Sequence, residues 1–318
     1  MAGVKRTLVV DLGGMPLTTP VMIASGCAGT GRELSGLVDL RKVGALVSRT
    51  ITVLPRKGAA TPRIRETPAG IVWDTGLQNP GLDAFMDEEL PRLTKPGVPV
   101  VVSISGATLE DHVRLTSAMQ RGSDVAAIEV YLSGRDEELG REVLGAHVDR
   151  VTEVVGAVAR MSRLPVYAKL PGGHGVADVV RAAVRAGATG VTVGGSPQAL
   201  GVDAERLRPD LGAVTGWLSG PAVKPLTLRA VFEAARAMPD VPVIASGGIR
   251  TGTDAVECLL AGAWAVQVGT ATLVDPTAPV QVAKGIARYL KAKNLASPQD
   301  LRGRLRVPAS FDPIEETV

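Results

Sequence analysis

Aromatic side chains are scarce in this chain. Only 3% of its 318 residues are Phe, Trp or Tyr, whereas 45% are hydrophobic overall. The core must therefore be built mainly from Ala, Val, Leu and Ile, as in sheets that helices cover. This composition, which is typical of a globular protein long enough for a large core, favours an α/β fold.

Cysteine and histidine are also rare. The two cysteines, Cys27 and Cys258, are far apart and form no CxxC pair, and the three histidines show no HxxxH or HxH spacing. An iron–sulfur cluster, a structural zinc site and a disulfide framework are therefore not expected within the chain. We predict that the protein has no metal site.

Long apolar runs and an excess of one charge are missing as well. The formal net charge is +3, and Lys and Arg are interspersed with Asp and Glu, which argues against a nucleic-acid-binding protein. There is no stretch of about 18 apolar residues, and the N-terminus lacks the apolar segment of a secretion signal. We predict a cytoplasmic protein that acts on a small molecule and not on nucleic acid or a membrane.

Short runs rich in β-branched residues alternate with amphipathic stretches along the chain. This alternation indicates repeated strand–helix units. Strands are predicted at residues 21–25, 45–51, 98–105, 126–132, 165–170, 190–195, 241–248 and 265–270. Eight strands with crossover helices predict one domain over residues 1–318, an α/β protein of the (β/α)₈ TIM-barrel type. A doubly wound open sheet is the alternative architecture.

Two connections, residues 53–95 and 196–224, are too long for plain strand-to-helix loops. Long loops after barrel strands lie over the C-terminal face of the barrel, where ligands bind. We therefore expect both segments to cover an active site.

The stretch IASGGIRTGTDAVECLLAGAWAVQVGTATL contains the clearest sign of a ligand site. The seventh predicted strand ends in Gly247 and Gly248, and the eighth ends in Gly269 and Thr270. In a barrel these strand ends are neighbours, and glycine lets backbone N–H groups approach an anion closely. Ordinary turn glycines are the plainer interpretation, but their shared position predicts a phosphate-binding cup.

Further motifs are spread over nearly the whole chain: ASG at 24–26, TPRIRETPAG at 61–70, GLQNPG at 76–81, AKL at 168–170, LSGPAVKP at 218–225, SGGI at 246–249 and VGT at 268–270. Together they make the sequence similar to the class 1 dihydroorotate dehydrogenases, which are FMN-dependent (β/α)₈ barrels. The resemblance implies a flavoprotein oxidoreductase that acts on a CH–CH or related two-electron bond. It also implies a homodimer.

The resemblance further implies an FMN site whose residues are all present. In the family the ASG turn lies against the flavin, a lysine reaches the flavin ring, and glycine-rich strand ends hold the phosphate. The corresponding residues here are Ala24, Ser25, Gly26, Lys169, Gly220, Gly247, Gly248, Gly269 and Thr270. A cation at Lys169 would stabilise the reduced, anionic flavin, although a strand-end lysine that reaches solvent is the plainer alternative.

The predicted catalytic loop departs from the family pattern. After its fourth strand the family carries a cysteine base, and the residue at that position here is Gly134. Glycine has no titratable group, so it cannot act as a general base. The remaining candidates for catalysis are Tyr131, Ser133 and Arg49, the last in place of a family lysine. Ser133 is one residue before the base position, and on a strand it would point to the opposite side.

The family asparagines that bind orotate are replaced as well, by Trp73, Tyr131, Asp136 and Gly195. Asn79 is kept. Loss of amide groups leaves the polar groups of orotate unpaired. We therefore predict that the substrate pocket takes a larger or less polar molecule than orotate and is formed by Trp73, Asn79, Tyr131, Asp136 and Trp217.

These observations favour an FMN-dependent oxidoreductase related to dihydroorotate dehydrogenase but with an altered substrate. One alternative is a genuine dihydroorotate dehydrogenase with an unusual base. Another is a flavin- or partner-binding protein without catalysis. Because the chain lacks cluster-binding cysteines, a relay through an iron–sulfur centre would require a separate electron-transfer subunit.

Overall fold

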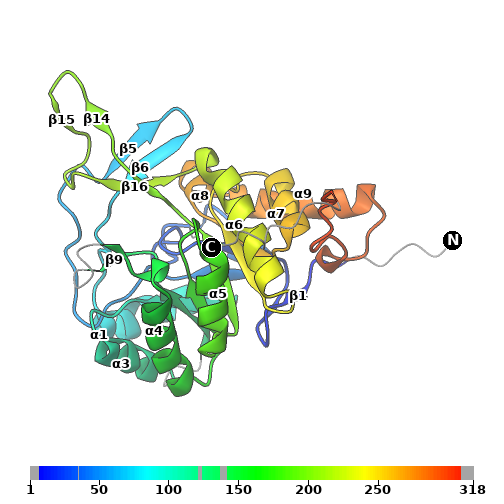
Figure 1. The fold of residues 1–318 in the computed structure, drawn as a ribbon, viewed down its shortest axis with the longest axis horizontal. Helices are drawn as coiled ribbons and strands as arrows, with labels where there is room; N and C mark the ends of the chain where they lie inside the picture. The colour runs from blue at the N-terminus through cyan, green and yellow to red at the C-terminus, as the bar shows by residue number, and fades with distance from the viewer. Residues whose placement is uncertain (1–6, 35, 121–123, 137–141, 309–318) are drawn as a thin grey trace.

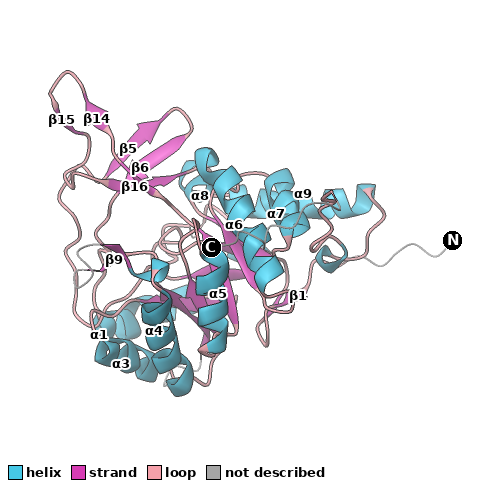
Figure 2. Ribbon diagram, viewed as in Figure 1, coloured by secondary structure: helices cyan, strands magenta, loops and turns pink. Residues whose placement is uncertain are grey.

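Eight parallel strands close into a barrel in the computed structural model, which describes residues 7–34, 36–120, 124–136 and 142–308. The strand order is β11-β12-β17-β18-β3-β4-β7-β8. Helices cover the outside of this barrel (Figures 1 and 2). The predicted (β/α)₈ TIM barrel is therefore confirmed, and the doubly wound open sheet is wrong because β18 pairs with β3 and closes the sheet.

The barrel strands are β3 (Val21–Ile23), β4 (Ala45–Val47), β7 (Val100–Ile104), β8 (Val125–Tyr131), β11 (Val166–Lys169), β12 (Gly190–Gly194), β17 (Val243–Ser246) and β18 (Ala265–Val268). Each overlaps one of the strands predicted from the sequence. Nearly all of their residues are buried, because one side faces the barrel interior and the other faces the helices. This double burial explains why the strands are predominantly apolar in the sequence.

The main helices are α3 (Leu109–Met119), α4 (Val148–Met161), α5 (Val176–Arg185), α6 (Lys224–Ala237), α7 (Gly252–Ala261) and α9 (Ala278–Ala292). Each buries one apolar face. On α4, for example, Val151, Val154, Val155 and Val158 recur at three- and four-residue spacing and join the main core. The helices predicted from amphipathic patterns are confirmed.

A small hairpin closes the N-terminal end of the barrel. Its strands are β1 (Val10–Asp11) and β2 (Pro16–Leu17), and its apolar side chains cluster with the lower interior of the barrel. The hydroxyl of the buried Tyr167 donates a hydrogen bond of 2.5 Å to the carbonyl of Leu12. The interior is therefore filled at this end, which leaves the opposite end for a ligand.

The two long connections combine into one antiparallel sheet above the barrel. The segment 53–95 supplies β5 (Ile64–Thr67) and β6 (Gly70–Trp73), and the segment 196–224 supplies β13 (Gln198–Ala199) and β16 (Gly216–Ser219). The strand order is β13-β16-β6-β5. Figure 1 shows this sheet at the upper left, with the hairpin of β14 (Val202–Asp203) and β15 (Arg208–Pro209) projecting beyond it.

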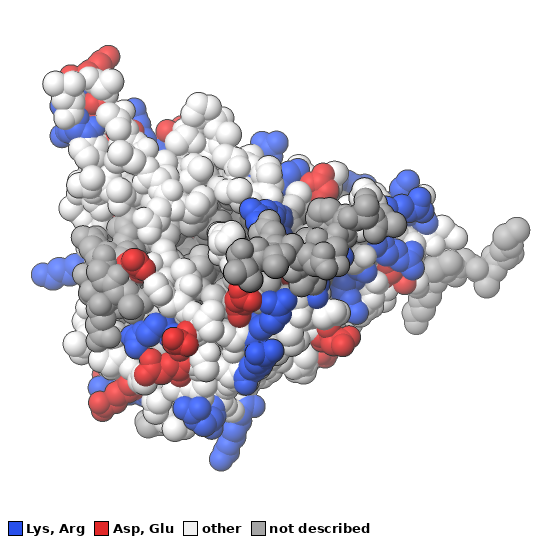
Figure 3. Space-filling view, in the orientation of Figure 1, with Lys and Arg blue, Asp and Glu red and all other residues white. Residues whose placement is uncertain are grey.

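The other short elements are η1 (Leu40–Lys42), α1 (Leu82–Ala84), the π-helix η2 (Phe85–Glu89), α2 (Leu90–Thr94), β9 (Arg135–Asp136), β10 (Glu142–Val143), η3 (Leu144–Ala146), η4 (Pro221–Val223), α8 (Thr270–Val274) and η5 (Pro298–Asp300). No helix in the described ranges is long and apolar enough to cross a membrane. On the face that Figure 3 shows, basic and acidic side chains are interspersed.

Candidate active site

A cavity of about 900 Å³ lies between the C-terminal ends of the barrel strands and the four-stranded sheet. Residues after β3, β4, β8, β11, β12, β17 and β18 line it from the barrel side, and β5, β6 and β16 line it from above. The cavity has the size of a cofactor or substrate pocket. It also occupies the end of the barrel at which TIM-barrel enzymes carry out their chemistry.

Glycines form one end of this cavity. The φ angles of Gly220, Gly247 and Gly248 are +102°, +128° and +73°, a region that other residues rarely adopt. Close neighbours also exclude a side chain: a Cβ on Gly248 would lie 2.5 Å from the backbone nitrogen of Lys224, and one on Gly247 would lie 2.6 Å from Oγ1 of Thr227. The backbone of these strand ends is therefore exposed to the cavity, as an anion-binding cup requires.

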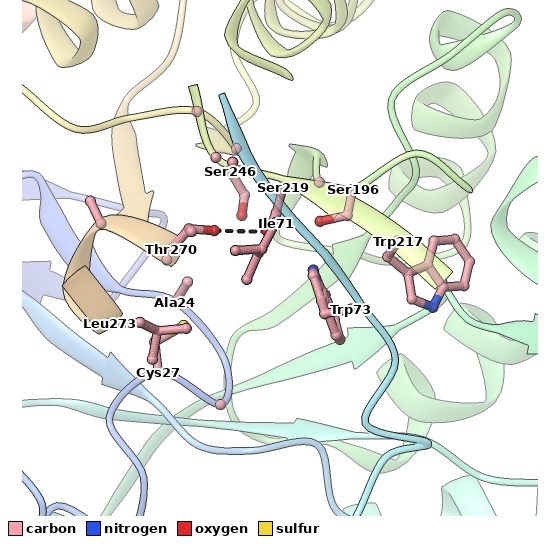
Figure 4. Close-up of a pocket in the computed structure, with 18 of the residues that line it drawn as sticks. Ala24, Cys27, Ile71, Trp73, Ser196, Trp217, Ser219, Ser246, Thr270 and Leu273 are labelled. Atoms are coloured by element: carbon pink, nitrogen blue, oxygen red, sulfur yellow. Dashed lines mark hydrogen bonds between the residues drawn. The ribbon is translucent and has the colours of Figure 1, made fainter. Parts of the chain in front are cut away.

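Gly269 and Thr270 lie at the same end of the cavity, as the sequence predicts. The hydroxyl groups of Thr270 and Ser219 are 2.8 Å apart and connect α8 to β16 (Figure 4). The predicted phosphate-binding residues are thus brought together from β16, β17 and β18.

Ion pairs behind the glycines fix this end of the site. Nζ of Lys224 lies 2.8 Å from a carboxylate oxygen of Asp254 and 2.8 Å from one of Glu257. Asp254 also accepts hydrogen bonds from the backbone of Arg250 and Thr251. Although partial burial acts in the opposite direction, the bonds from Lys224 and Thr251 hold the pKa of Asp254 below its ordinary value. The loop after β17 therefore has a defined conformation.

Lys169 lies at the floor of the cavity and does not extend to solvent, so that alternative from the sequence is wrong. Only 9% of the residue is exposed. Its Nζ donates to Oε1 of Glu129 at 3.1 Å and to Oε1 of Gln267 at 3.0 Å. Oε2 of Glu129 accepts from Gln267 at 2.6 Å and from Thr192 at 3.0 Å. Four strands thus hold one buried cation in place.

The motifs of the sequence did not reveal the hydrogen-bonding partners of Lys169 and Glu129. Glu129, Gln267 and Thr192 are polar residues within otherwise apolar strands, and each is at most 1% exposed. A buried polar residue needs a hydrogen-bonding partner. Each of them is a single polar residue in an apolar run, AAIEVYL, AVQVGT or GVTVGG. This pattern was the signal that could have predicted a polar layer inside the barrel.

The turn of Ala24, Ser25 and Gly26 follows β3 and lines the cavity. The hydroxyl of Ser25 donates to the carbonyl of Ser48 at 2.8 Å, which ties the turn to the end of β4. Burial raises the pKa of the neighbouring Cys27 thiol to about 11. At neutral pH this thiol keeps its proton, so Cys27 does not supply a thiolate base.

On the other side of the cavity, Tyr131 and Ser133 both line the wall. Because β8 ends at Tyr131, the alternation of a strand, on which the expected direction of Ser133 was based, does not apply at Ser133. Its hydroxyl lies 3.3 Å from the backbone carbonyl of Lys169 and donates to it. A hydroxyl engaged in this way is poorly placed to become a base.

The four-stranded sheet presents an apolar face to the cavity. Trp73 of β6 lies directly opposite Trp217 of β16, and Ile64 of β5 lies opposite Trp73. Opposed residues share a face, and so does Ile71, two residues before Trp73. In Figure 4, Ile71 and Trp73 project toward the side on which Ala24 and Cys27 lie. We call these four residues, Ile64, Ile71, Trp73 and Trp217, the apolar wall.

Arg49 also lines the cavity, and its Nε lies 3.3 Å from the carboxylate of Glu89. Burial raises the pKa of Glu89, although the charge of Arg49 acts in the opposite direction. Gly195 lines the cavity as well, and no atom lies within 4 Å of the place where its Cβ would stand. The position therefore leaves open space next to the site.

The structure does not bring Asn79 to the cavity. Its side-chain nitrogen donates to Thr52 and Leu77, and its oxygen accepts from the backbone of Gly81. Asn79 thus stabilises its own loop. Its predicted place in the substrate pocket is therefore wrong. The backbone of Asp136 lies in β9, but its side chain falls outside the part of the chain that the structure describes.

In the described part of the chain, no three His, Cys, Asp or Glu side chains are arranged to hold a metal ion. Glycine-rich strand ends beside a buried lysine instead fit an organic cofactor that carries a phosphate. The closed barrel, the glycine-rich strand ends and the buried Lys169 together are typical of TIM-barrel enzymes that bind a cofactor with a phosphate group.

Comparison with known proteins identifies the family within this class. The sequence pattern of dihydroorotate dehydrogenase matches residues 7–290, and the chain belongs to this family. Its members are FMN-dependent oxidoreductases that act on a CH–CH bond, so the predicted enzyme class and cofactor are confirmed.

Curated relatives cover almost the whole chain. The catalytic subunit of dihydroorotate dehydrogenase B (NAD(+)) from Geotalea daltonii is 42% identical over 95% of this chain and 99% of the relative. The protein of the same name from Desulforudis audaxviator is 42% identical over 94% of this chain and 97% of the relative. The structure of the Eimeria tenella dihydroorotate dehydrogenase in complex with ferulenol has the same fold, with a TM-score of 0.75 at 22% identity over 93% of this chain and 88% of that one.

Proposed function

We propose that this protein is an FMN-dependent oxidoreductase of the dihydroorotate dehydrogenase family that acts on a substrate other than dihydroorotate. The observation that carries the proposal is the substrate side of the cavity. Position 134, where the resemblance implies a base, is glycine, and Trp73 and Trp217 lie directly opposite one another in the wall above. A site of this kind favours a planar, weakly polar molecule over orotate.

The residues present fit FMN, because its phosphate would lie on the cup formed by Gly220, Gly247, Gly248, Gly269 and Thr270. A Cβ at three of these positions would meet neighbouring atoms at 2.6 Å or less. Bound FMN supplies two-electron transfer. Lys169, held by Glu129 and Gln267, would place a fixed positive charge near the flavin ring and so stabilise negative charge on it.

The chain's own side chains would then bind the substrate and manage its proton. The apolar wall offers apolar area against which a substrate can pack. Tyr131 presents a phenolic O–H group, which can donate a hydrogen bond or a proton to the substrate. Arg49 adds a cation that can bind an anionic substituent of the substrate.

A genuine dihydroorotate dehydrogenase is the second candidate, and the names of relatives at about 40% identity support it. It would require a base other than position 134. Ser133 lines the cavity, so Ser133→Ala tests whether Ser133 is that base.

We also propose that electrons pass to or from a separate subunit. The similar proteins are named catalytic subunits, which supports a partner. The only two cysteines are too far apart in sequence for a cluster motif, and burial raises the pKa of the Cys258 thiol to about 12. An iron–sulfur relay would therefore have to reside in the partner.

The purified protein should contain one FMN per chain, and Gly248→Ala should weaken FMN binding at least about 10-fold. The new methyl group would meet the backbone of Lys224 at a φ of +73°, so the cup must distort. Titration of FMN-free protein, followed by quenching of FMN fluorescence, measures the affinity. Gly303→Ala is the matched control, because Gly303 has a φ of +68° but open space around it. A colourless protein that takes up no FMN would contradict the proposal.

We predict a homodimer in solution, as the family resemblance implies. The β14–β15 hairpin exposes apolar side chains, with Leu207 90% and Val202 61% exposed, and association would remove such surface from water. Light scattering at micromolar concentration should give twice the chain mass of 32.9 kDa. The mass of a single chain would rule the prediction out.

A further inference from the structure

The ring of Tyr131 lies at the place where a side chain on Gly134 would begin. A Cβ on Gly134 would lie 2.9 Å from Cε1 of Tyr131, 3.6 Å from Cδ1 and 3.8 Å from Cζ, the three nearest atoms outside Gly134 and its two chain neighbours. Carbon atoms in contact are normally about 3.5 to 4.0 Å apart. A residue with a side chain at position 134 would therefore clash with the ring of Tyr131 in its observed position.

The backbone does not require glycine at this position. The φ of Gly134 lies outside the left-handed region that favours glycine. By contrast, the cofactor-cup residues Gly220, Gly247 and Gly248 all have positive φ. An alanine at position 134 is thus opposed by the ring of Tyr131 and not by the backbone conformation.

Hydrogen bonds hold the backbone around this contact. The N–H of Leu132 donates to the carbonyl of Lys169 at 3.0 Å, and its carbonyl accepts from Gly145 at 2.7 Å. The carbonyl of Gly134 accepts from Leu144 at 3.2 Å. A larger residue at 134 would therefore have to displace the ring, because displacing the backbone would break these bonds.

The strand register directs Tyr131 into the site. Tyr131 pairs with Lys169 on the neighbouring strand β11, and Glu129, two residues earlier on β8, points into the barrel. Side chains two residues apart on a strand share a side. The phenol thus stands at the cavity wall above the polar layer, next to the place where a side chain at 134 would stand.

We propose that Gly134 is the positioning residue for Tyr131: the missing side chain leaves room for the phenol, which becomes the group that faces the substrate at this position. The inference rests on the proposed function for its chemical meaning, since a phenol that holds its proton suits a substrate that accepts one. The two residues act as a pair, and restoring a side chain at 134 removes the phenol from its place.

Thermal unfolding of single and double variants tests the contact. Gly134→Ala should lower Tm by roughly 2 to 6 °C, the effect of overpacking. In the Tyr131→Ala background the same change should leave Tm unchanged or raise it, because Gly→Ala then only restricts the unfolded chain. Gly173→Ala is the matched control, since Gly173 is exposed, has no positive φ and has open space around it. Equal losses of Tm in both backgrounds would overturn the proposal.

Fluorine NMR of protein labelled with 3-fluorotyrosine reports the position of the ring itself. The chain has three tyrosines, and Tyr131→Phe assigns the signal of interest. Gly134→Ala should shift that signal and leave those of Tyr167 and Tyr289 in place, whereas Gly173→Ala should shift none. An unmoved Tyr131 signal would overturn the proposal. Neither measurement uses a substrate, so failure of the proposed function would not alter these outcomes.

Discussion

Dihydroorotate is expected to reduce the bound FMN of this protein about 10² to 10⁴ times more slowly than it reduces FMN in a relative with a positioned base, because general base catalysis typically supplies that factor. Gly134 offers no titratable group, and the hydroxyl of Ser133 is engaged with the carbonyl of Lys169. Anaerobic stopped-flow absorbance follows the bleaching of the flavin. The Geotalea daltonii relative, 42% identical, is a suitable comparison.

Gly134→Cys should not restore the reaction. The new side chain would meet the ring of Tyr131, 2.9 Å from its Cβ, and Trp73 and Gly195 would still lack the amide groups that the resemblance implies for binding orotate. Tyr131→Asn/Gly134→Cys removes the obstruction and should therefore bleach faster than Gly134→Cys alone, though more slowly than the relative.

Rapid bleaching in the natural protein would contradict the altered substrate and support a genuine dihydroorotate dehydrogenase. Ser133→Ala then decides whether Ser133 is the base. If this variant loses the rapid bleaching while FMN stays bound, Ser133 provides the missing proton acceptor. If it retains the bleaching, the base lies elsewhere in the cavity.

The barrel could be predicted from the sequence because its strands are buried on both sides. Runs such as VPVVVSIS and VPVIASGG are mostly apolar, and the helices between them carry regular apolar faces. The antiparallel sheet above the barrel could not be predicted. Its strands are two to four residues long, which is too short for a periodic signal, and Trp73 meets Trp217 only when both long connections are in place.

The candidate site shows the same division. The glycines of the cup lie in short local motifs, so their place at the strand ends could be predicted from the sequence. The partners of Lys169, Glu129 and Gln267, come from two other strands, and Thr192 of a third strand bonds Glu129, so the group assembles only inside the closed barrel. Asn79 was misassigned because a motif does not reveal that the side chain is already saturated by its own loop. The direction of the Ser133 side chain could not be predicted from strand alternation, because β8 ends before Ser133.

Removal of the Glu129 carboxylate should destabilise the protein strongly. Lys169 is 9% exposed and Glu129 is 1% exposed, so Glu129→Ala leaves a buried positive charge without its counter-ion. Breaking a buried ion pair by removing one partner costs about 3 to 5 kcal/mol. Urea unfolding of the FMN-free protein, followed by circular dichroism, should show a lower midpoint at an unchanged slope.

The double variant Glu129→Leu/Lys169→Met separates the buried charge from the lost packing. Replacing both partners by apolar residues of similar volume is often nearly neutral for stability, so the double variant should unfold at a higher urea concentration than Glu129→Ala. Gln267 then loses Lys169 as a donor and Glu129 as an acceptor, which leaves a residual cost of about 1 to 3 kcal/mol. A loss below about 1 kcal/mol in Glu129→Ala would contradict the prediction, because it would mean that Lys169 finds another counter-charge or reaches solvent.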